Sequence, residues 1–189
     1  MEEFKVNIEN VVAFASLGND IPLSIISKQL ENVEYNPESF PGMIYRIDDP
    51  KVATLIFSSG KLVCTGAKDI EEAKTGIHTV VGHLRDLGIE LPYDFEIRIE
   101  NIVASTKIEA ENKINLEEIA FSLENTEYEP ESFPGLVFRI NDPRVAFLLF
   151  GSGKIICTGA RKIEDIHVAL EKLKKMLESV GVKIKTRKE

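Results

Sequence analysis

Short segments in which hydrophobic and polar residues alternate are separated by longer segments whose apolar residues lie three or four positions apart. Alternation is typical of a strand, and the longer spacing is typical of a helix. Residues 5–14, rich in Val and Ile, predict a strand, and residues 21–31 predict a helix with Asp20 as its N-cap and Pro22 in its first turn. After a Phe-Pro-Gly loop, the pattern predicts strands at 43–47, 51–57 and 61–65 and a helix at 70–87 that ends at Gly88.

The second half of the chain repeats this order. Residues 32–73 align with residues 125–166 without a gap, and 26 of the 42 positions are identical. The elements expected in the second copy are a strand at 97–104, a helix at 116–123, three strands within 136–158 and a helix at 163–180. We therefore expect two repeats, residues 1–93 and residues 94–189, the second of which ends in a short basic tail of Lys183, Lys185, Arg187 and Lys188.

The connections between the last three strands of each copy are too short for anything but hairpins, so these strands are expected to be antiparallel and the fold to be α+β. Four helices cannot cover both faces of so wide a sheet. Nevertheless both faces of the strands at 62–65 and 155–158 are apolar, whereas a solvated face is normally polar. Something large is therefore expected to cover the second face.

Composition and charge narrow the classes of function. The 189 residues are 43% hydrophobic and 29% charged, which is typical of a globular protein, and the lack of an apolar run of membrane length or a signal-like N-terminus leads us to expect an intracellular protein. The formal charge of −8 argues against a nucleic-acid partner. However, cations recur at matching positions beside the strands of both copies, namely Arg46, Lys61, Lys68, Arg139, Lys154 and Arg161.

No pattern of catalytic or metal-binding residues stands out. Cys64 and Cys157 occupy equivalent apolar positions and are expected to be core thiols rather than a disulfide or metal site. His78 and His83 are five residues apart, which does not place them on one helix face. The Gly-Ser-Gly-Lys segment at 151–154 lacks the spacing of a phosphate-binding loop. We expect neither an enzyme nor a bound cofactor.

Four phenylalanines occupy unusual places. Phe40 and Phe133 lie in Ser-Phe-Pro-Gly loops, and Phe57 and Phe150 immediately precede hairpin turns. One interpretation is that they cap the core, and the other is that the paired rings act as wedges at the ends of a symmetric sheet. The sequence pattern alone leaves both open.

Several paired motifs together carry a resemblance to a known family. They are the Glu-Ser-Phe-Pro-Gly loops, the Leu-x-Phe-x-Ser-Gly-Lys turns, the Thr-Gly-Ala segments and the Ile-Glu-Asn-(Val/Ile)-Val strands. From about residue 5 to residue 180, the chain closely resembles the TATA-box-binding proteins, in an archaeal-type form. The resemblance implies a saddle, which is a curved antiparallel sheet of about ten strands with four helices on its convex face. It also implies a general transcription initiation factor whose bare sheet face binds the minor groove of A·T-rich TATA-box promoter DNA.

The resemblance further implies roles for individual residues. The phenylalanine pairs would be DNA wedges that bend the duplex, and the six cations named above would bind phosphates. The floor against the minor groove would comprise Asn10, Val12, Leu55, Val63, Thr65, Asn101, Val103, Leu148, Ile156 and Thr158. Phe14 departs from the family pattern, because its counterpart is the small Ser105: either it crowds the groove or the strand ends before it.

Partners are implied in the same way. Glu129 and Glu131 would bind a transcription factor B homologue, and through it the RNA polymerase pre-initiation complex. The protein would be cytoplasmic and associated with the nucleoid in an archaeal cell, or nuclear in a eukaryote, with no membrane partner. The sequence leaves open whether it forms a homodimer when it is free of DNA. The alternative function is symmetric binding of a protein or of a small apolar ligand through the bare sheet face.

Overall fold

The computed structural model describes residues 4–185, which form two compact units. The first unit is Glu9–Asn101, and the second unit comprises residues 4–8 and 102–185. Each unit carries one copy of the repeat. The boundary between residues 93 and 94 stays a prediction, and Arg187 and Lys188 of the expected basic tail lie outside the described residues.

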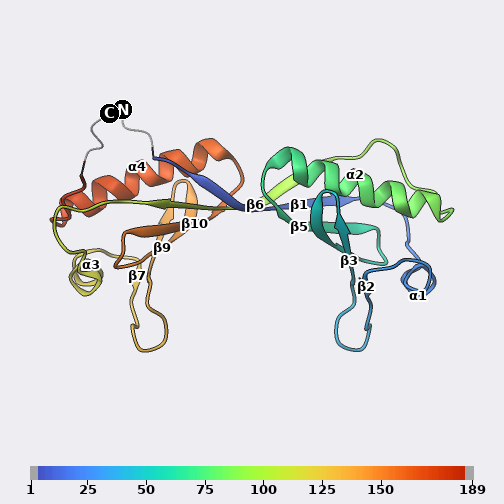
Figure 1. Cartoon of the computed structure of the whole chain (residues 1–189), viewed down its shortest axis with the longest axis horizontal. Coiled ribbons are helices and arrows are strands. Elements are labelled where there is room, and N and C mark those ends of the chain that lie inside the picture. Colours follow the sequence, from blue (N-terminus) through green and yellow to red (C-terminus); the bar gives the residue numbers. More distant parts are fainter. Residues whose placement is uncertain (1–3, 186–189) are drawn as a thin grey trace. The chain divides into compact units, whose positions relative to one another are not determined.

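The first unit is an antiparallel sheet with a long helix packed on one face (Figure 1). Its strands lie in the order β2-β3-β4-β5-β1, and the Asp-Asp-Pro and Ser-Ser-Gly turns join β3 to β4 and β4 to β5. The long helix α2 contacts β4 and β5. The elements are β1 (Asn7–Ser16), which belongs to this unit from Glu9 onward, α1 (Leu23–Ile26), β2 (Val33–Glu34), β3 (Met43–Asp48), β4 (Lys51–Ile56), β5 (Lys61–Ala67) and α2 (Ile70–Asp86).

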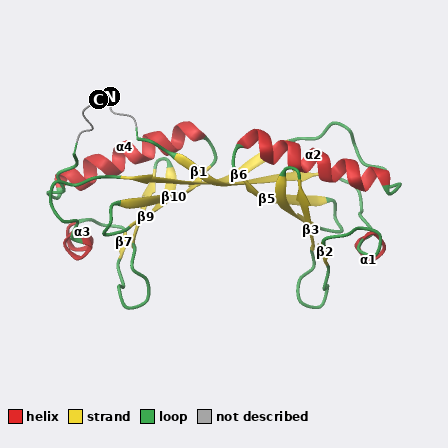
Figure 2. Cartoon of the chain, viewed as in Figure 1, coloured by secondary structure: helices red, strands yellow, loops and turns green. Residues whose placement is uncertain are grey.

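The second unit repeats this arrangement with the strand order β6-β10-β9-β8-β7, and α4 contacts β10 (Figure 2). Its elements are β6 (Ile97–Lys107), which belongs to this unit from Ile102 onward, α3 (Leu116–Ser122), β7 (Thr126–Glu127), β8 (Leu136–Asn141), β9 (Arg144–Leu149), β10 (Lys154–Ala160) and α4 (Ile163–Ser179). The described chain thus contains ten strands with antiparallel pairing and four helices. This confirms the predicted α+β class and the tandem repeat.

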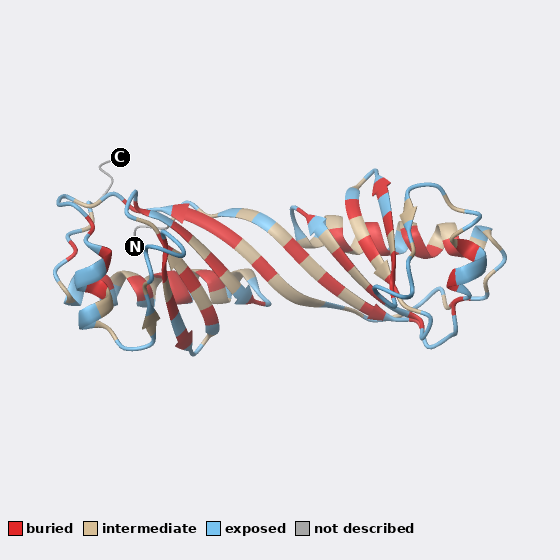
Figure 3. Ribbon diagram, turned by 90° about the horizontal axis from the view of Figure 1, so that it is seen from below, coloured by how far each residue is buried: buried red, intermediate tan, exposed pale blue. Residues whose placement is uncertain are grey.

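The core of each unit lies between the sheet and its long helix. Along β1, Val11, Ala13 and Ala15 are buried against the helix side, whereas Val12 and Phe14 are only half-buried. Figure 3 shows this alternation of buried and half-buried residues along the strands of both units. Helix α2 contributes the predicted apolar stripe, which comprises Ala73, Ile77, Val80, Val81 and Leu84.

Three details of the local structure differ from the prediction. Helix α1 covers only Leu23–Ile26 instead of residues 21–31, and Pro22 rather than Asp20 is its N-cap, so both the predicted length and the predicted cap are wrong. The reason is that Pro22 has a ψ of 81°, outside the helical region, so the helix cannot extend back to Asp20. Strands β2 and β7 were missed because two residues are too short for any periodic pattern.

Candidate functional site

The first unit has an apolar sheet face that α2 does not cover. We call it the open face of the first unit, and its half-buried members on β1, β4 and β5 include Val12, Leu55, Val63 and Thr65. Leu55 lies directly opposite Val63 in the register of β4 and β5. These four residues, all predicted for the groove floor, therefore share one face of this sheet.

The open face of the second unit is built in the same way from Val103, Leu148, Ile156 and Thr158 on β6, β9 and β10. Ile156 lies opposite Leu148, as Val63 lies opposite Leu55 in the first unit. Each predicted floor residue is half-buried, whereas its strand neighbours that point toward α4 are buried. Two similar apolar faces thus result from the repeated sequence.

The register adds residues that the sequence analysis did not include. Ile44 and Ala53 lie on the open face of the first unit, and Val137 and Ala146 occupy the equivalent positions in the second. Period-two counting along their strands would have found them. Strand β1 continues to Ser16 and places Phe14 opposite Val63, so the alternative in which the strand ends before Phe14 is wrong.

Asn10 lies on the open face with its amide held in one orientation. Its Oδ1 accepts a hydrogen bond from the Gly66 N–H at 2.7 Å, and its Nδ2 donates to Thr65 Oγ1 at 3.2 Å. Because a backbone N–H can only donate, the amide oxygen must point toward Gly66 and the NH2 group away from it. The β-bulge beside Val11 and the positive φ of Gly66, 95°, position this N–H. Asn101 is the half-buried counterpart on β6.

The four phenylalanines form two equivalent pairs. The ring centroids of Phe40 and Phe57 are 5.9 Å apart with an interplanar angle of 69°, and those of Phe133 and Phe150 are 5.9 Å apart at 70°. Both pairs are edge-to-face, a favourable aromatic geometry. Phe40 and Phe133 remain 41% exposed, so the loop rings are not core residues. In each unit this loop projects from the sheet on the side away from the long helix (Figure 1).

A glycine behind each pair makes this ring packing fit. A Cβ on Gly42 would lie 2.8 Å from Phe40 Cε1 and 3.0 Å from Phe57 Cε1. A Cβ on Gly135 would lie 2.8 Å from Phe133 Cε1. The glycine of the Phe-Pro-Gly motif is therefore needed for the close approach of both rings.

The predicted phosphate-binding cations are exposed, but two of them have acidic partners. Arg46 Nη1 is 3.0 Å from Glu34 Oε1, and Arg139 Nη1 is 3.2 Å from Glu127 Oε1. Lys68 Nζ donates to the backbone oxygen of Glu9 at 2.9 Å. Lys61, Lys154 and Arg161 are also exposed. Because the two ion pairs are exposed, each contributes at most about 1 kcal/mol and can exchange for a phosphate.

The loop between β7 and β8 carries the predicted partner-binding acids. Glu129 and Glu131 are both exposed. The backbone oxygen of Glu129 accepts hydrogen bonds from the N–H groups of Ser132 at 3.0 Å and Phe133 at 2.9 Å. The loop is thus folded on itself, with two carboxylates presented beside Phe133. In the first unit the residue equivalent to Glu129 is the neutral Asn36.

The remaining titratable groups of interest are core residues. Burial raises the pKa of Cys64 to about 11 and that of Cys157 to about 12, so both thiols are protonated at neutral pH. Among residues 4–185, no group of three or more His, Cys, Asp and Glu side chains is placed to hold a metal ion. No helix in this part of the chain has the length and apolarity that crossing a membrane requires.

Comparison with known proteins places these features in one family. The sequence model of the family described as transcription factor TFIID, or TATA-binding protein, matches residues 5–87 and 96–180. The TATA-box-binding protein of Methanothermobacter thermautotrophicus is 52% identical over 177 residues, covering 94% of this chain and 97% of that protein. That of Thermoplasma volcanium is 51% identical, covering 96% and 98%. The solved Methanococcus jannaschii TBP has a TM-score of 0.84 and 46% identity, covering 92% and 98% of the two chains.

Proposed function

The chain belongs to the family of transcription factor TFIID, or TATA-binding protein, and from this premise we propose that it is a general transcription initiation factor that binds the minor groove of A·T-rich TATA-box promoter DNA. The observation that carries the proposal is the pair of open faces, each with an apolar floor and a phenylalanine pair. The TATA-box-binding proteins at about 50% identity over nearly the whole chain support it.

The chemistry of the floor suits A·T pairs. In the minor groove, A·T pairs show only acceptor atoms, whereas G·C pairs add the guanine amino group. An apolar floor of Val, Leu and Ile side chains would leave that amino group without a hydrogen-bond partner, which costs about 1–3 kcal/mol. The open faces therefore favour A·T-rich sites by excluding guanine rather than by reading each base.

Asn10 and Thr65 can supply the polar contact on this floor. One N–H of the Asn10 amide is used by Thr65 Oγ1, and the other remains to donate to a base acceptor. Thr65 Oγ1 accepts from Asn10, so its own proton is also available as a donor. We propose that Asn101 and Thr158, their counterparts in the second copy of the repeat, are also donors to base acceptors.

The phenylalanine pairs would be the wedges. In each pair the half-exposed loop ring is supported edge-to-face by the ring at the strand end. Inserting a ring between base steps costs roughly a few kcal/mol per step, a figure for which TATA-binding proteins are themselves the known example. The larger contact that a bent duplex makes with the apolar floor offsets this cost.

The cations beside the strands would bind phosphates without reading the sequence. Lys61, Lys154 and Arg161 have exposed side chains that would reach phosphates, and Lys68 would reach a phosphate from its place beside β1. Arg46 and Arg139 would exchange their glutamate partners for phosphates. Binding should therefore weaken steeply with salt.

Gel-shift titration tests the DNA-binding proposal directly. Wild-type protein, the double variant Phe40→Ala with Phe133→Ala, and the control Phe121→Ala are titrated against a TATA-type duplex and a G·C-rich duplex at one salt concentration. Phe121 is a matched control because its ring is 88% exposed on α3, away from the open face. We expect selective TATA binding that the double variant weakens on the order of 100-fold, since buried aromatic anchors are typical hot spots.

Equal affinity of the wild-type protein for the two duplexes would contradict the proposal. It would favour the second reading, in which the open faces bind a protein or a small apolar ligand. An unchanged affinity of the double variant would keep DNA binding but reject the wedges.

We further propose that Glu129 and Glu131 contact a basic surface of a transcription factor B homologue, which in turn brings in RNA polymerase. The support is the loss of symmetry, because Asn36 replaces the glutamate at this place in the first unit. Charge reversal of Glu129 and Glu131 to Lys is expected to abolish the ternary complex on DNA while leaving the binary complex intact. The matched control is Asn36→Lys with Glu38→Lys, and a ternary complex that survives the first double variant would reject this contact.

Without DNA, the open faces need another cover. We propose that the free protein self-associates through them as a homodimer, because exposed apolar surfaces of this kind favour association. Sedimentation equilibrium with and without a TATA duplex tests this, since DNA should displace the second copy and leave one protein per duplex.

A further inference from the structure

The open faces of the two units differ at one place on their floor. A row of residues crosses the first open face as Ile44, Leu55, Val63 and Phe14, each opposite the next in the strand register. The equivalent row of the second open face is Val137, Leu148, Ile156 and Ser105. The exchange of Ile44 for Val137 removes one methylene and that of Val63 for Ile156 restores it. The net difference in volume between the rows therefore lies in Phe14 against Ser105.

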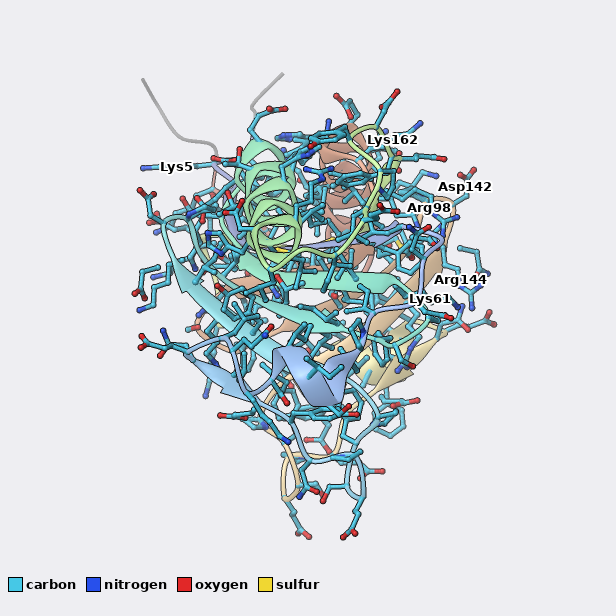
Figure 4. All side chains as sticks on the ribbon, turned by 90° about the vertical axis from the view of Figure 1, so that its right-hand side faces the viewer. Lys5, Lys61, Arg98, Asp142, Arg144 and Lys162 are labelled. Carbon is cyan, nitrogen blue, oxygen red and sulfur yellow. The ribbon has the colours of Figure 1, made fainter. Side chains whose placement is uncertain are left out.

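Phe14 lies beside a cation whose equivalent in the other copy of the repeat is a neutral residue. The guanidinium carbon of Arg98 lies 4.9 Å from the centroid of the Phe14 ring, within the range of a cation–π contact. Arg98 is exposed and also lies 3.8 Å from a Glu100 carboxylate oxygen. Figure 4 labels Arg98 and Lys61, which lie on the same side of the first unit in that view. The residue equivalent to Arg98 in the first strand is Asn7, so only the Phe14 ring has such a partner.

The two side chains would treat a G·C pair differently. A phenylalanine ring fills the space that a guanine amino group needs and offers it no acceptor, so the amino group would be buried without a hydrogen bond. Ser105 is much smaller and only 9% exposed, so it lies below its larger neighbours and leaves more room there for the amino group or for a bridging water. The same base pair is thus penalised more under Phe14 than under Ser105.

We propose that Phe14, positioned by Arg98, makes the half-site under the first unit strictly A·T, whereas Ser105 makes the half-site under the second unit tolerant of a G·C pair. This inference rests on the proposed minor-groove binding. It gives the nearly symmetric protein a preferred direction on any site in which only one half contains a G·C pair. The direction follows because the protein would turn so that the G·C pair lies under the second unit.

A self-complementary TATATATA duplex reads the same in both directions, so the protein can bind it either way round with equal affinity. A G·C pair is introduced at one position, at its mirrored position, or at both, and each mirrored pair of positions is scanned in turn. The wild-type protein can escape a single G·C pair by turning round, but it cannot escape two. The critical positions in the DNA are the two mirrored base pairs under Phe14 and Ser105. There we expect two G·C pairs to weaken binding about tenfold more than the product of the two single losses of affinity.

Two substitutions should remove this excess penalty for opposite reasons. Phe14→Ser is expected to abolish the excess, because both half-sites become tolerant. Ser105→Phe is expected to remove the escape, so that a single G·C pair already costs about tenfold. Arg98→Lys keeps the charge but loses the planar stack, so it should reduce the excess without changing the affinity for TATATATA.

The direction in which the protein lies on DNA can be measured by site-directed DNA cleavage. An iron chelate is attached to a cysteine introduced by Glu38→Cys, an exposed loop position, and it cleaves the DNA near that loop. The natural Cys64 and Cys157 are buried and will not compete for the label. On a duplex with one G·C pair, cleavage should favour one end, and the exchange variant Phe14→Ser with Ser105→Phe should move it to the other end.

The possible outcomes separate the two proposals. If the wild-type protein does not prefer TATATATA over a G·C-rich duplex, the minor-groove function itself fails. The proposed role of Phe14 is overturned if the protein prefers TATATATA but two further results are found. The first is that the loss of affinity for two G·C pairs equals the product of the two single losses at every mirrored pair. The second is that Phe14→Ser changes neither these losses nor the direction of binding. Thermal unfolding of each variant verifies that any loss comes from a folded protein, and Ser105→Phe keeps the test decisive if Phe14→Ser does not fold.

Discussion

At the scale of single residues, Gly42 shows how one missing atom shapes the candidate wedge. Gly42→Ala would place a Cβ 2.8 Å from one ring and 3.0 Å from the other, so the Phe40 ring must turn outward. Because this ring is partly exposed, we expect a loss of stability of only about 1 kcal/mol, at the low end for overpacking. Affinity for a TATA duplex should fall much more than stability, because the pair geometry is lost.

Two further glycines test this prediction, one as a repeat of the change in the second unit and one as a control. Gly135→Ala should give the same result, since the second pair has the same contacts. Gly82→Ala in α2 meets no atom within 4 Å and should stabilise the protein by about 0.5–1 kcal/mol, as alanine favours a helix. Urea unfolding and gel shifts on the three variants measure both effects. Equal losses of affinity for Gly42→Ala and Gly82→Ala would contradict the packing argument.

The two core thiols predict how stability depends on alkaline pH. Burial raises the pKa of Cys64 to about 11, above its ordinary value of 9.0. The folded protein therefore keeps a proton that the unfolded chain releases, and this contribution to stability is complete below pH 9 and is lost as pH rises from about 9 to 11. Urea midpoints should fall over this range, and Cys64→Ala with Cys157→Ala should fall less steeply. Rapid modification of either thiol at pH 8 by a thiol reagent in the native state would contradict the buried assignment.

At the scale of the strands, two buried threonines in different bonding situations give opposite predictions for one substitution. Thr54 on β4 is fully buried, and its Oγ1 has no hydrogen-bond partner. It faces the Cys64 thiol and acts to lower the pKa of that thiol. Thr106 on β6 is also buried, but its Oγ1 donates to the Lys5 backbone oxygen at 2.7 Å. We expect Thr54→Val to stabilise the protein by about 1 kcal/mol and Thr106→Val to destabilise it by about 1–2 kcal/mol.

Urea unfolding of the two valine variants measures this difference. The substitution is nearly isosteric, so the change in volume is the same at both sites and only the hydroxyl differs. A loss of stability at Thr54 equal to that at Thr106 would show that the Thr54 hydroxyl has a partner after all.

The repeating elements were predictable because their signals are periodic. Strand β1, the hairpins and the long helices bury apolar residues at regular spacing, which one sequence reveals. Asp20 failed as a cap because the local conformation of Pro22 decides where α1 begins. The glutamate partners of Arg46 and Arg139 come from β2 and β7, two-residue strands without a periodic signal, so their pairing appears only in the register.

The candidate floor was predictable in part. Val12, Leu55 and Val63 are fixed by period-two counting once the resemblance indicates which face matters. The row that ends in Phe14 needs the cross-strand register, which depends on the β-bulge in β1. Bulges disrupt regular alternation and carry no simple sequence signal. For this reason only the structure shows that Phe14 lies on the open face opposite Val63.

At the scale of the whole molecule, a formal charge of −8 opposes association with DNA, and the two Arg–Glu pairs limit the positive charge available to phosphates. The double variant Glu34→Gln with Glu127→Gln removes both partners and leaves the arginines. An exposed ion pair is worth up to about 1 kcal/mol, so we expect affinity for a TATA duplex to rise about fivefold for each arginine released. The log–log slope of affinity against salt should stay close to that of the wild type, because both arginines already contact phosphates in the wild-type complex.

Glu31→Gln with Glu124→Gln is the matched control for this last prediction. These glutamates are exposed, occupy equivalent positions in the two copies and lie in no ion pair within the described residues. The control makes the same change in net charge, so it reports the general effect of charge alone. Fluorescence anisotropy titrations across a range of salt concentrations separate the two variants. A gain in affinity no larger than that of the control would mean that Arg46 and Arg139 do not bind phosphates and that phosphate binding belongs to the lysines and Arg161.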